Sequence, residues 1–320
     1  MSHTPIPPDI IAPHRSLLAT PASSMKMIAK AHASAADAVF LDLEDSVAED
    51  EKDSARRNAI LALKELDWKA AGKTVSLRIN GLDTSHSLKD LLSVVAESGD
   101  RLDSVIIPKI GVAADLYAVD LILRQIAETA GRAHHIVLEA LIETALGAQN
   151  LDEISRYNRD QGDARLVALH FGAGDFAASV ASSMVDIGGL HADYPGDLWH
   201  GVLSRLVVAA RGNGLQPMDS AYGDFNDPEG YEASARRAAA LGMAGKWAIH
   251  PSQISLANAI FSPSASRLAE ARSIISALDE AEAGGLGAAT HQGRMIDAAS
   301  IRMARRLLAL AEAIESRGKN

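Results

Sequence analysis

Short apolar runs alternate along this chain with longer segments in which apolar residues recur at helical spacing. The helical segments include Ala113–Thr129 and Pro228–Leu241, where apolar side chains return about every three to four positions. The short runs are typical of buried strands, because they are rich in β-branched and other apolar residues. They lie at Ser16–Ala19, Ala38–Leu43, Thr74–Ile79, Ser104–Pro108, Ile136–Ile142, Leu166–Phe171, Leu215–Met218 and Lys246–Ile249. The pattern therefore predicts eight strands separated by helices.

The alternation of strands and helices places the chain in the α/β class. Eight strands, each followed by a helix, is the count of a (β/α)8 TIM barrel. A doubly wound open sheet has the same alternation, and periodicity alone cannot show whether a sheet closes. The strand count favours the barrel, with the open sheet as the alternative.

The pattern changes after the eighth strand. It predicts helices over Ser252–Ile260, Ala265–Ala283 and Ala298–Arg317. The last two are separated by Gly284–Ala289, whose dense glycines indicate a turn or a hinge. We therefore expect residues 1–262 to form the barrel and residues 263–320 to form a helical extension.

The second predicted strand ends in a cluster of acids. Asp42, Glu44 and Asp45 lie within four positions, directly after an apolar run. A buried strand accommodates three carboxylates only where they emerge at its end. There they would offer hard oxygen donors that suit Mg²⁺ or that orient groups around it. The sequence therefore predicts chemistry at the C-terminal end of this strand.

Other polar residues follow the remaining strands in the same way. They are Arg78 and Asn80, Lys109, Glu143, Asp175, Asp219 and His250. In a barrel the C-terminal strand ends face one mouth, where active sites form. Carboxylates there suit Mg²⁺, which keeps positions open for substrate oxygens, and a neighbouring arginine suits a carboxylate or an enolate oxygen. The pattern predicts a Mg²⁺-dependent barrel enzyme that acts on an oxoacid or a hydroxyacid.

Each of these residues also has a purely structural interpretation. Glu44 and Asp45 could cap the following helix or pair with its basic residues. Asp175 could be a helix N-cap after a glycine turn, and Arg78 could be a buried partner of the acids. Glu143 is harder to explain in this way, because it ends an apolar strand.

Composition and missing motifs exclude several classes of function. The chain has 320 residues, a net charge of −10 and no basic block, which argues against a nucleic-acid partner. It has no cysteine, which excludes disulfides, thiolate metal sites and a cysteine nucleophile. Gly172-Ala173-Gly174 is an incomplete dinucleotide motif and more readily lets the backbone approach a ligand. No apolar stretch approaches the roughly 18 residues of a membrane span, and the N-terminus has no signal pattern, so we expect a cytoplasmic protein.

Several segments resemble the citrate lyase β-subunit/HpcH–HpaI aldolase superfamily, over about Arg15 to Arg306. The resemblance is carried by His14-Arg15-Ser16, Phe40-Leu41-Asp42-Leu43-Glu44-Asp45-Ser46-Val47, Arg78-Ile79-Asn80-Gly81-Leu82-Asp83-Thr84, Ile107-Pro108-Lys109, Leu141-Ile142-Glu143-Thr144 and Gly245-Lys246-Trp247-Ala248-Ile249-His250-Pro251-Ser252-Gln253. Within it, the chain is most similar to the malyl-CoA/β-methylmalyl-CoA lyases at the third of these segments, at Asp115–Asp120, at Tyr222–Phe225 and at Lys246–Pro251.

The resemblance implies a TIM barrel that uses Mg²⁺, or Mn²⁺ in its place, and a CoA thioester. The implied reaction is that of an oxo-acid lyase: reversible cleavage of L-malyl-CoA to acetyl-CoA and glyoxylate, or of β-methylmalyl-CoA to propionyl-CoA and glyoxylate. The implied partners are an acyl-CoA, a glyoxylate-type oxoacid and further copies of the chain, in a homotrimer or homohexamer with shared active sites.

The resemblance also implies roles for individual residues. Glu143 and Asp175 correspond to the metal ligands, and Arg78 corresponds to the arginine that binds substrate and stabilises an enolate. Asp297 corresponds to a general acid/base that the C-terminal extension, acting as a lid, supplies to a neighbouring subunit. The positions that match CoA or substrate contacts are Lys30, Gly174, Asp175, Ile249 and His250, together with Arg78.

The chain departs from its close relatives at two of the CoA-contact positions. They often have an aromatic and a basic residue where this chain has Ala19 and Ser24, so contacts to the adenine and phosphates of CoA are expected to be weaker or differently placed. Gly188–Trp199, which borders the expected mouth, is shorter than in typical relatives, which bears on the acyl group accepted. Glu44 and Asp45 are expected to support the metal ligands from behind.

Other activities fit the same scaffold. One is a citramalyl-CoA or other 3-hydroxyacyl-CoA lyase, and another is a malyl-CoA thioesterase. In a different class, the chain could be a non-catalytic acyl-CoA-binding paralogue, against which the intact Arg78, Glu143, Asp175 and Asp297 argue.

Overall fold

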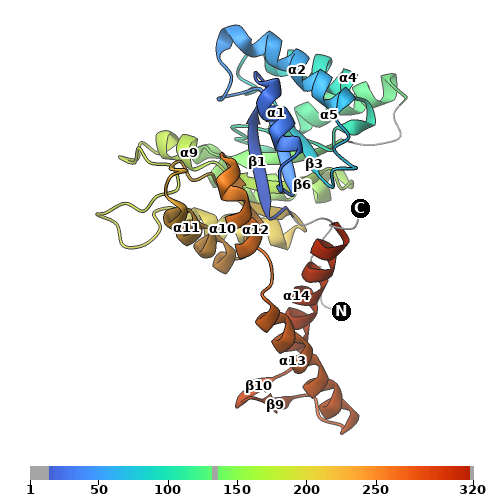
Figure 1. The fold of residues 1–320 in the computed structure, drawn as a ribbon, viewed down its shortest axis with the longest axis vertical. Coiled ribbons are helices and arrows are strands. Elements are labelled where there is room, and N and C mark those ends of the chain that lie inside the picture. The colour runs from blue at the N-terminus through green and yellow to red at the C-terminus, as the bar shows by residue number, and fades with distance from the viewer. Residues whose placement is uncertain (1–13, 132–135, 318–320) are drawn as a thin grey trace.

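The strands form a closed parallel barrel in the order β1 to β8, with β1 paired to β8 (Figure 1). The computed structural model describes residues 14–131 and 136–317. The barrel strands are β1 (Ser16–Pro21), β2 (Ala38–Asp42), β3 (Thr74–Arg78), β4 (Ser104–Ile107), β5 (Val137–Ile142), β6 (Leu166–Phe171), β7 (Gln216–Asp219) and β8 (Gly245–Ala248). All eight predicted strands are confirmed to within a few residues. Closure confirms the TIM barrel and excludes the open sheet.

Helices surround the barrel, as the alternating pattern predicts. They are α1 (Met25–His32), α2 (Lys52–Glu65), α3 (Ser87–Asp90), α4 (Ala96–Ser98), α5 (Ala113–Thr129), α6 (Ala145–Gln149), α7 (Leu151–Ser155), α8 (Tyr157–Gln161), α9 (Ala173–Ser179), α10 (His200–Gly212), α11 (Pro228–Leu241) and α12 (Ile254–Ile260). A π-helical turn, η2 (Leu91–Val95), joins α3 to α4, and short 3₁₀ turns lie at η1 (Glu49–Glu51), η3 (Gly99–Arg101) and η4 (Pro251–Gln253). α12 begins two residues later than predicted, because η4 precedes it.

Alternate residues of each strand face the barrel interior, which separates two apolar layers. One cluster, which includes Leu17, Phe40, Leu141 and Trp247, fills the barrel itself. The larger cluster lies between the sheet and the helices and takes the intervening strand positions, such as Leu18. Interior positions recur every second residue along each strand. The inward-facing row of side chains therefore continues up to the polar residues at the strand ends, at the mouth.

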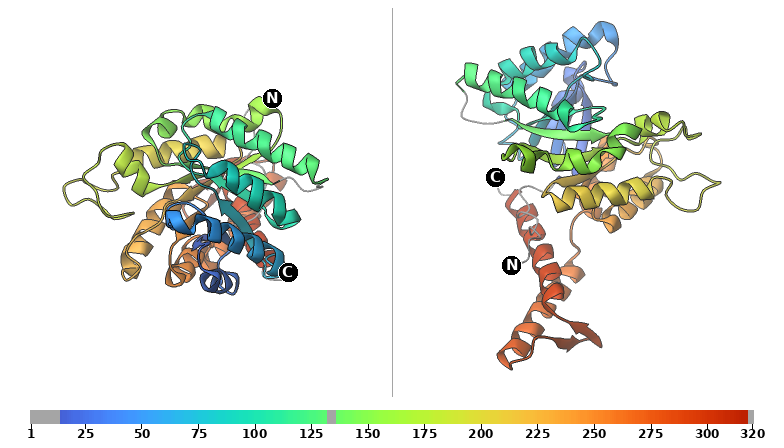
Figure 2. Two further views of the ribbon diagram at one scale, coloured as in Figure 1. Left: turned by 90° about the horizontal axis from the view of Figure 1, so that it is seen from above. Right: turned by 180° about the vertical axis from the view of Figure 1, so that it is seen from behind.

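The C-terminal extension consists of α13 (Ala265–Ala283), a hairpin of β9 (Ala289–His291) and β10 (Arg294–Ile296), and α14 (Ala298–Arg317). Both predicted helices are confirmed, whereas the hairpin between them was not predicted. The extension has its own small core, formed by Leu278, Ile296 and Ile301. It projects away from the barrel, with the hairpin at its far end (Figures 1 and 2).

The extension leaves the barrel at the end opposite the mouth. Arg317, at the end of α14, donates to the carbonyl oxygen of Gly72 and to the Thr74 hydroxyl, both at 2.9 Å, where β3 begins. The glycines at 284–287 lie at the far end of α13, where they lead into the hairpin. The hinge expected at these glycines stays a prediction, and a bend there would move the hairpin relative to α13 rather than α13 relative to the barrel. We propose that the domain boundary lies at Ser262-Pro263, just before α13.

In the described part of the chain, no helix is both long and apolar enough to cross a membrane.

Candidate active site at the barrel mouth

Arg78, the last residue of β3, is fixed by a two-pronged bond to Asp42. Arg78 Nε and Nη2 donate to Asp42 Oδ1 and Oδ2, each at 2.7 Å. Asp42 ends the neighbouring strand β2 and pairs with Arg78 in the sheet register, so the backbone alone brings the two side chains together. Burial acts to lower the pKa of Arg78, but Asp42 and the nearby acids raise it above its usual value. Arg78 therefore keeps its charge and its orientation at the mouth.

The acidic tip of β2 surrounds the free edge of this arginine. Arg78 Nη1 lies 3.0 Å from Glu44 Oε2 and 3.3 Å from Asp45 Oδ2. Lys109 Nζ donates to Glu44 Oε1 at 2.6 Å. Burial, followed by the charge of Asp45, raises the pKa of Glu44 to about 7 although Arg78 and Lys109 oppose the shift. The interpretation of Glu44 and Asp45 as partners of the following helix is wrong for their side chains, which face the mouth groups.

Lys109 joins three parts of the site, where the sequence predicts its position at the mouth but no role for it. Its φ of 54° is unusual for a residue with a side chain. In this conformation its backbone N–H donates to Glu143 Oε1 at 2.9 Å. Its Nζ lies 3.6 Å from Asp45 Oδ1 and 3.9 Å from Asp175 Oδ1. The backbone thus holds one expected metal ligand while the side chain lies beside the other.

Glu143 and Asp175 meet at the ends of β5 and β6. Glu143 is buried, and burial, with repulsion from Glu44 and Asp175, raises its pKa to about 8. Asp175 lies in the first turn of α9, whose N-cap is Gly172, so the structural interpretation of Asp175 as an N-cap is wrong.

The donor set fits a magnesium ion. Within residues 14–131 and 136–317, no three acidic or histidine side chains come close enough together to hold a metal ion by themselves. Mg²⁺ is commonly held by only one or two carboxylates and keeps water or substrate oxygens in its other positions. Burial and then repulsion from Glu44 and Asp175 raise the pKa of Glu143, and a divalent cation held by Glu143 and Asp175 would relieve that repulsion.

Beside these residues lies a cavity of about 280 Å³. Its lining comes from the loops after β2, β3 and β4 and includes Glu44, Asp45, Asn80, Thr84 and Lys109. The cavity therefore lies beside the acidic tip of β2 and Lys109.

The absence of a side chain at Gly172 leaves the space that the Glu143 side chain occupies. A Cβ at position 172 would collide with the side chain of Glu143. Gly172→Ala is therefore expected to displace the Glu143 carboxylate and lower turnover by at least about 10²-fold, because a shift of about 1 Å in a catalytic group can cost that much. The matched control is Gly201→Ala, since a Cβ there meets nothing within 4 Å. Steady-state rates of both folded variants check this, and equal activities would show that Glu143 is not needed where it lies.

The remaining residues expected from the sequence lie in different places. Gly174 is in the first turn of α9 beside Asp175. Ala19 lies in β1, and Ser24 caps α1 by accepting from the Met27 N–H. Lys30 is exposed in the last turn of α1, farther from the mouth than Ser24.

The segment after β8 forms part of the rim. Ile249 and His250 are both partly exposed there. Phe225 stacks on His250 with ring centroids 4.9 Å apart, and 48% of Phe225 is exposed. Sequence reasoning named Phe225 only as part of a similar segment, since nothing in the sequence shows that the loop after β7 reaches His250.

Asp297 is the one expected catalytic residue that the structure does not bring to the mouth. It lies between β10 and α14, at the far end of the extension. There its Oδ1 accepts from the backbone N–H groups of Ala299 and Ser300, at 2.8 and 3.2 Å. These hydrogen bonds, first that of Ser300, lower the pKa of Asp297. In a single chain it serves as the cap of α14.

Comparisons with known proteins place the chain in a family. The chain is 44% identical to the L-malyl-CoA/β-methylmalyl-CoA lyase of Cereibacter sphaeroides, over 97% of this chain and 98% of the relative. It is 36% identical to a (3S)-malyl-CoA thioesterase of the same species, over 94% and 96%. Among solved structures, CitE of Mycobacterium tuberculosis, in complex with magnesium, acetoacetate and coenzyme A, covers 94% of this chain and 99% of its own, with a TM-score of 0.73 and 30% identity. The model of the HpcH/HpaI aldolase/citrate lyase family matches residues 15–251, so the chain belongs to this family and is an enzyme of the lyase class.

Proposed function

We propose that this protein is a Mg²⁺-dependent carbon–carbon lyase that reversibly cleaves L-malyl-CoA to acetyl-CoA and glyoxylate, or β-methylmalyl-CoA to propionyl-CoA and glyoxylate. The proposal rests mainly on the cluster of charged residues at the mouth. In this cluster Arg78 is bound to Asp42 and lies near the carboxylates of Glu143 and Asp175. The similarity to curated lyases along nearly the whole chain supports it.

Glu143 and Asp175 would hold the metal ion. When bound, Mg²⁺, or Mn²⁺ in its place, supplies Lewis-acid polarisation of the oxoacid carbonyl. Glu44 and Asp45 would not bind the metal ion themselves but would support its ligands, because they hold Lys109 and Arg78 in place. Lys109 in turn orients Glu143 through its backbone N–H.

Asp297 and Arg78 would carry out the proton transfer and the charge stabilisation. In the synthetic direction, Asp297 removes a proton from the methyl group of acetyl-CoA, and Arg78 stabilises the negative charge that develops on the thioester oxygen. The resulting carbanion attacks the carbonyl carbon of glyoxylate, which forms the new carbon–carbon bond, and the former carbonyl oxygen takes up a proton to become the hydroxyl of malyl-CoA. Cleavage is the reverse, and Asp297 returns the proton. Burial in a closed site would raise the pKa of Asp297 towards the working pH.

The rim would bind CoA. Ile249, His250, Gly174 and Lys30 match contact positions of the family, and the stacked rings of Phe225 and His250 offer a surface on which an adenine can pack. Close relatives often have an aromatic and a basic residue where this chain has Ala19 and Ser24. The surface formed by Phe225 and His250 would replace the CoA contacts that those residues make in the relatives.

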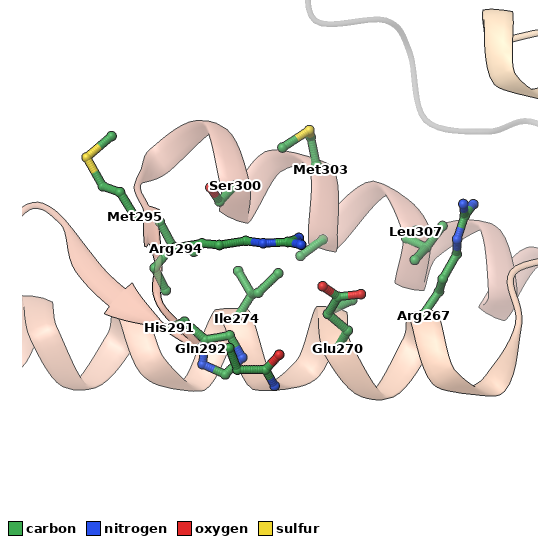
Figure 3. A pocket seen from close by; sticks show the side chains of 13 residues that line it. Arg267, Glu270, Ile274, His291, Gln292, Arg294, Met295, Ser300, Met303 and Leu307 are labelled. Atoms are coloured by element: carbon green, nitrogen blue, oxygen red, sulfur yellow. The ribbon is translucent and has the colours of Figure 1, made fainter.

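Asp297 would come from a neighbouring copy of the chain. The extension leaves the barrel opposite the mouth, so Asp297 does not reach its own mouth. On the extension, a cavity of about 480 Å³ lies between α13, the hairpin and α14, and its lining includes Met295 of β10 and Met303 of α14 (Figure 3). Both methionines are largely exposed, at 76% and 68%, and exposed apolar side chains beside a cavity are typical of an interface. We propose a homotrimer or homohexamer in which each extension covers a neighbour's mouth.

Arg78→Lys tests whether Arg78 acts in the reaction. Lysine keeps the charge but loses the planar fork, which here holds Asp42 with one edge and lies beside Glu44 and Asp45 with its remaining nitrogen. We expect the folded variant to lose at least about 10-fold in turnover. Near-normal rates, in protein whose thermal unfolding matches the wild type, would show that Arg78 is structural.

A product analysis tests the proposed reaction and separates it from the alternatives. Purified protein is incubated with Mg²⁺, a panel of acyl-CoAs and either glyoxylate or pyruvate, and the products are identified by mass. The proposal predicts malyl-CoA from acetyl-CoA and β-methylmalyl-CoA from propionyl-CoA. Condensation with pyruvate instead of glyoxylate would indicate a citramalyl-CoA lyase. No turnover of any acyl-CoA would support a binding paralogue.

A malyl-CoA thioesterase is the second candidate, because one relative at 36% identity carries that name. A thioesterase would release free malate and CoA from malyl-CoA. The same assay decides between the two, since only the lyase forms a carbon–carbon bond.

A further inference from the structure

A pair of buried polar residues inside the barrel has no part in the proposed reaction. His170 Nε2 lies 2.6 Å from Glu139 Oε2, and both side chains are almost completely buried. Glu139 comes from β5 and His170 from β6. Glu139 Oε1 also accepts from the hydroxyls of Ser76 and Ser104. Burying such a pair adds little to stability, because its desolvation offsets its attraction and apolar residues of similar size fold at least as well.

The pair is connected to the aromatic floor of the mouth. Trp247 Nε1 donates to His170 Nδ1 at 2.9 Å. An indole N–H can only donate, so His170 Nδ1 carries no proton, and Nε2 bears the hydrogen that Glu139 accepts. Glu139 thus fixes the tautomer and the plane of His170, and His170 fixes the rotation of the Trp247 indole.

Trp247 in turn lies under Arg78. The Arg78 guanidinium carbon is 5.7 Å from the centroid of the Trp247 ring and 5.5 Å from that of Phe40. The two rings pack on each other with centroids 4.7 Å apart. Asp42 fixes one edge of the guanidinium, and the rings fix the tilt of its plane.

We propose that Glu139 and His170 are positioning residues that fix the Trp247 indole, and that Trp247 thereby sets the tilt of Arg78 towards the substrate. This proposal rests on the role given to Arg78 under the proposed function. It explains why a barrel filled mainly by apolar side chains keeps a hydrogen-bonded Glu–His–Trp series directly beneath its mouth.

Kinetics of conservative variants test the proposal. Trp247→Phe keeps a ring under Arg78 but removes the N–H donor. We expect it to lower kcat roughly 10-fold, with the KM for acyl-CoA within about two-fold, because misorientation affects the transition state more than substrate binding. In an Arg78→Lys background the same change should cost less than about two-fold, since Trp247 acts through Arg78.

The matched control is Trp68→Phe. Trp68 is also buried and donates its indole N–H, to the Ala62 carbonyl oxygen at 3.2 Å, but on the helical side of the sheet. It should leave kcat unchanged. His170→Gln should retain more activity than His170→Leu, because an amide can still donate to Glu139 and accept from the indole. If Trp247→Phe lowers kcat by the same factor in the wild type and in the Arg78→Lys background, the proposal is overturned.

A second readout does not depend on the reaction. The chain has three tryptophans, so Trp68→Phe with Trp199→Phe leaves Trp247 as the sole emitter. In that protein Arg78→Ala and His170→Gln should each change the emission of Trp247, while Arg57→Ala, at an exposed position on α2, should not. If neither Arg78→Ala nor His170→Gln changes the emission of Trp247, the proposal is overturned. Absence of malyl-CoA turnover in the wild type would overturn the proposed function, and the emission would still decide whether His170 and Arg78 are coupled to the Trp247 indole.

Discussion

Mixed oligomers of two inactive variants are expected to regain activity. Arg78→Ala removes the enolate-stabilising group, and Asp297→Ala removes the general acid/base, so each variant alone should be nearly inactive. The two residues are far apart within one subunit. Arg78 lies at the barrel mouth, whereas Asp297 lies between β10 and α14 in the extension, which leaves from the opposite end of the barrel. If each site takes Asp297 from a neighbour, some mixed sites receive both intact groups. With random mixing in a closed ring, roughly a quarter of sites should recover.

Subunit exchange must be shown for this result to count. Co-expression of the two variants with different tags, followed by purification on both tags, yields oligomers that contain both chains. A matched mixture of Arg78→Ala with Gly172→Ala, both of which damage the same barrel mouth, should recover nothing. If exchanged Arg78→Ala and Asp297→Ala oligomers stay as inactive as their parents, Asp297 is not supplied in trans to the site that contains Arg78.

Removal of the metal or of its ligands is expected to have an effect of similar size. Glu143→Gln and Asp175→Asn should each lower turnover at least about 10²-fold, because a misplaced metal forfeits several kcal/mol of charge stabilisation. Both changes keep the shape of the side chain and remove only its charge. EDTA should abolish wild-type activity, and Mg²⁺ or Mn²⁺ should restore it.

Thermal unfolding gives a reaction-independent control for these variants. Burial and two neighbouring acids raise the pKa of Glu143 in the metal-free fold, so neutral glutamine should leave the metal-free protein at least as stable as the wild type. Added Mg²⁺ should raise the unfolding temperature of the wild type more than that of either variant. Full activity in metal-free buffer, or equal stabilisation of all three proteins, would contradict the assignment.

Much of the barrel could be predicted because its signals are local. Each strand is a short apolar run, and the polar residue that follows it marks the mouth, so Arg78, Glu143 and Asp175 were found from their positions alone. The hairpin β9–β10 was missed because its strands are short and largely exposed, and their composition carries no apolar run.

The parts that could not be predicted depend on contacts between distant segments. Lys109 matters because its positive φ directs its N–H to Glu143, and a lysine in a Pro-Lys segment gives no sign of that conformation. The Glu139–His170–Trp247 series joins three strands through side chains that alternate inward, and the spacing within each strand does not show which partners meet. The role of Asp297 came from resemblance, since in one chain it is a helix cap.

The most direct test of the account is the fate of malyl-CoA itself. Purified protein is given L-malyl-CoA and Mg²⁺, and acetyl-CoA, glyoxylate, free CoA and malate are measured over time. A Mg²⁺-dependent malyl-CoA lyase should form acetyl-CoA and glyoxylate in equal amounts, with neither formed in EDTA or by the Glu143→Gln variant. Malate and free CoA without glyoxylate, or malyl-CoA left intact by metal-loaded and assembled protein, would contradict it.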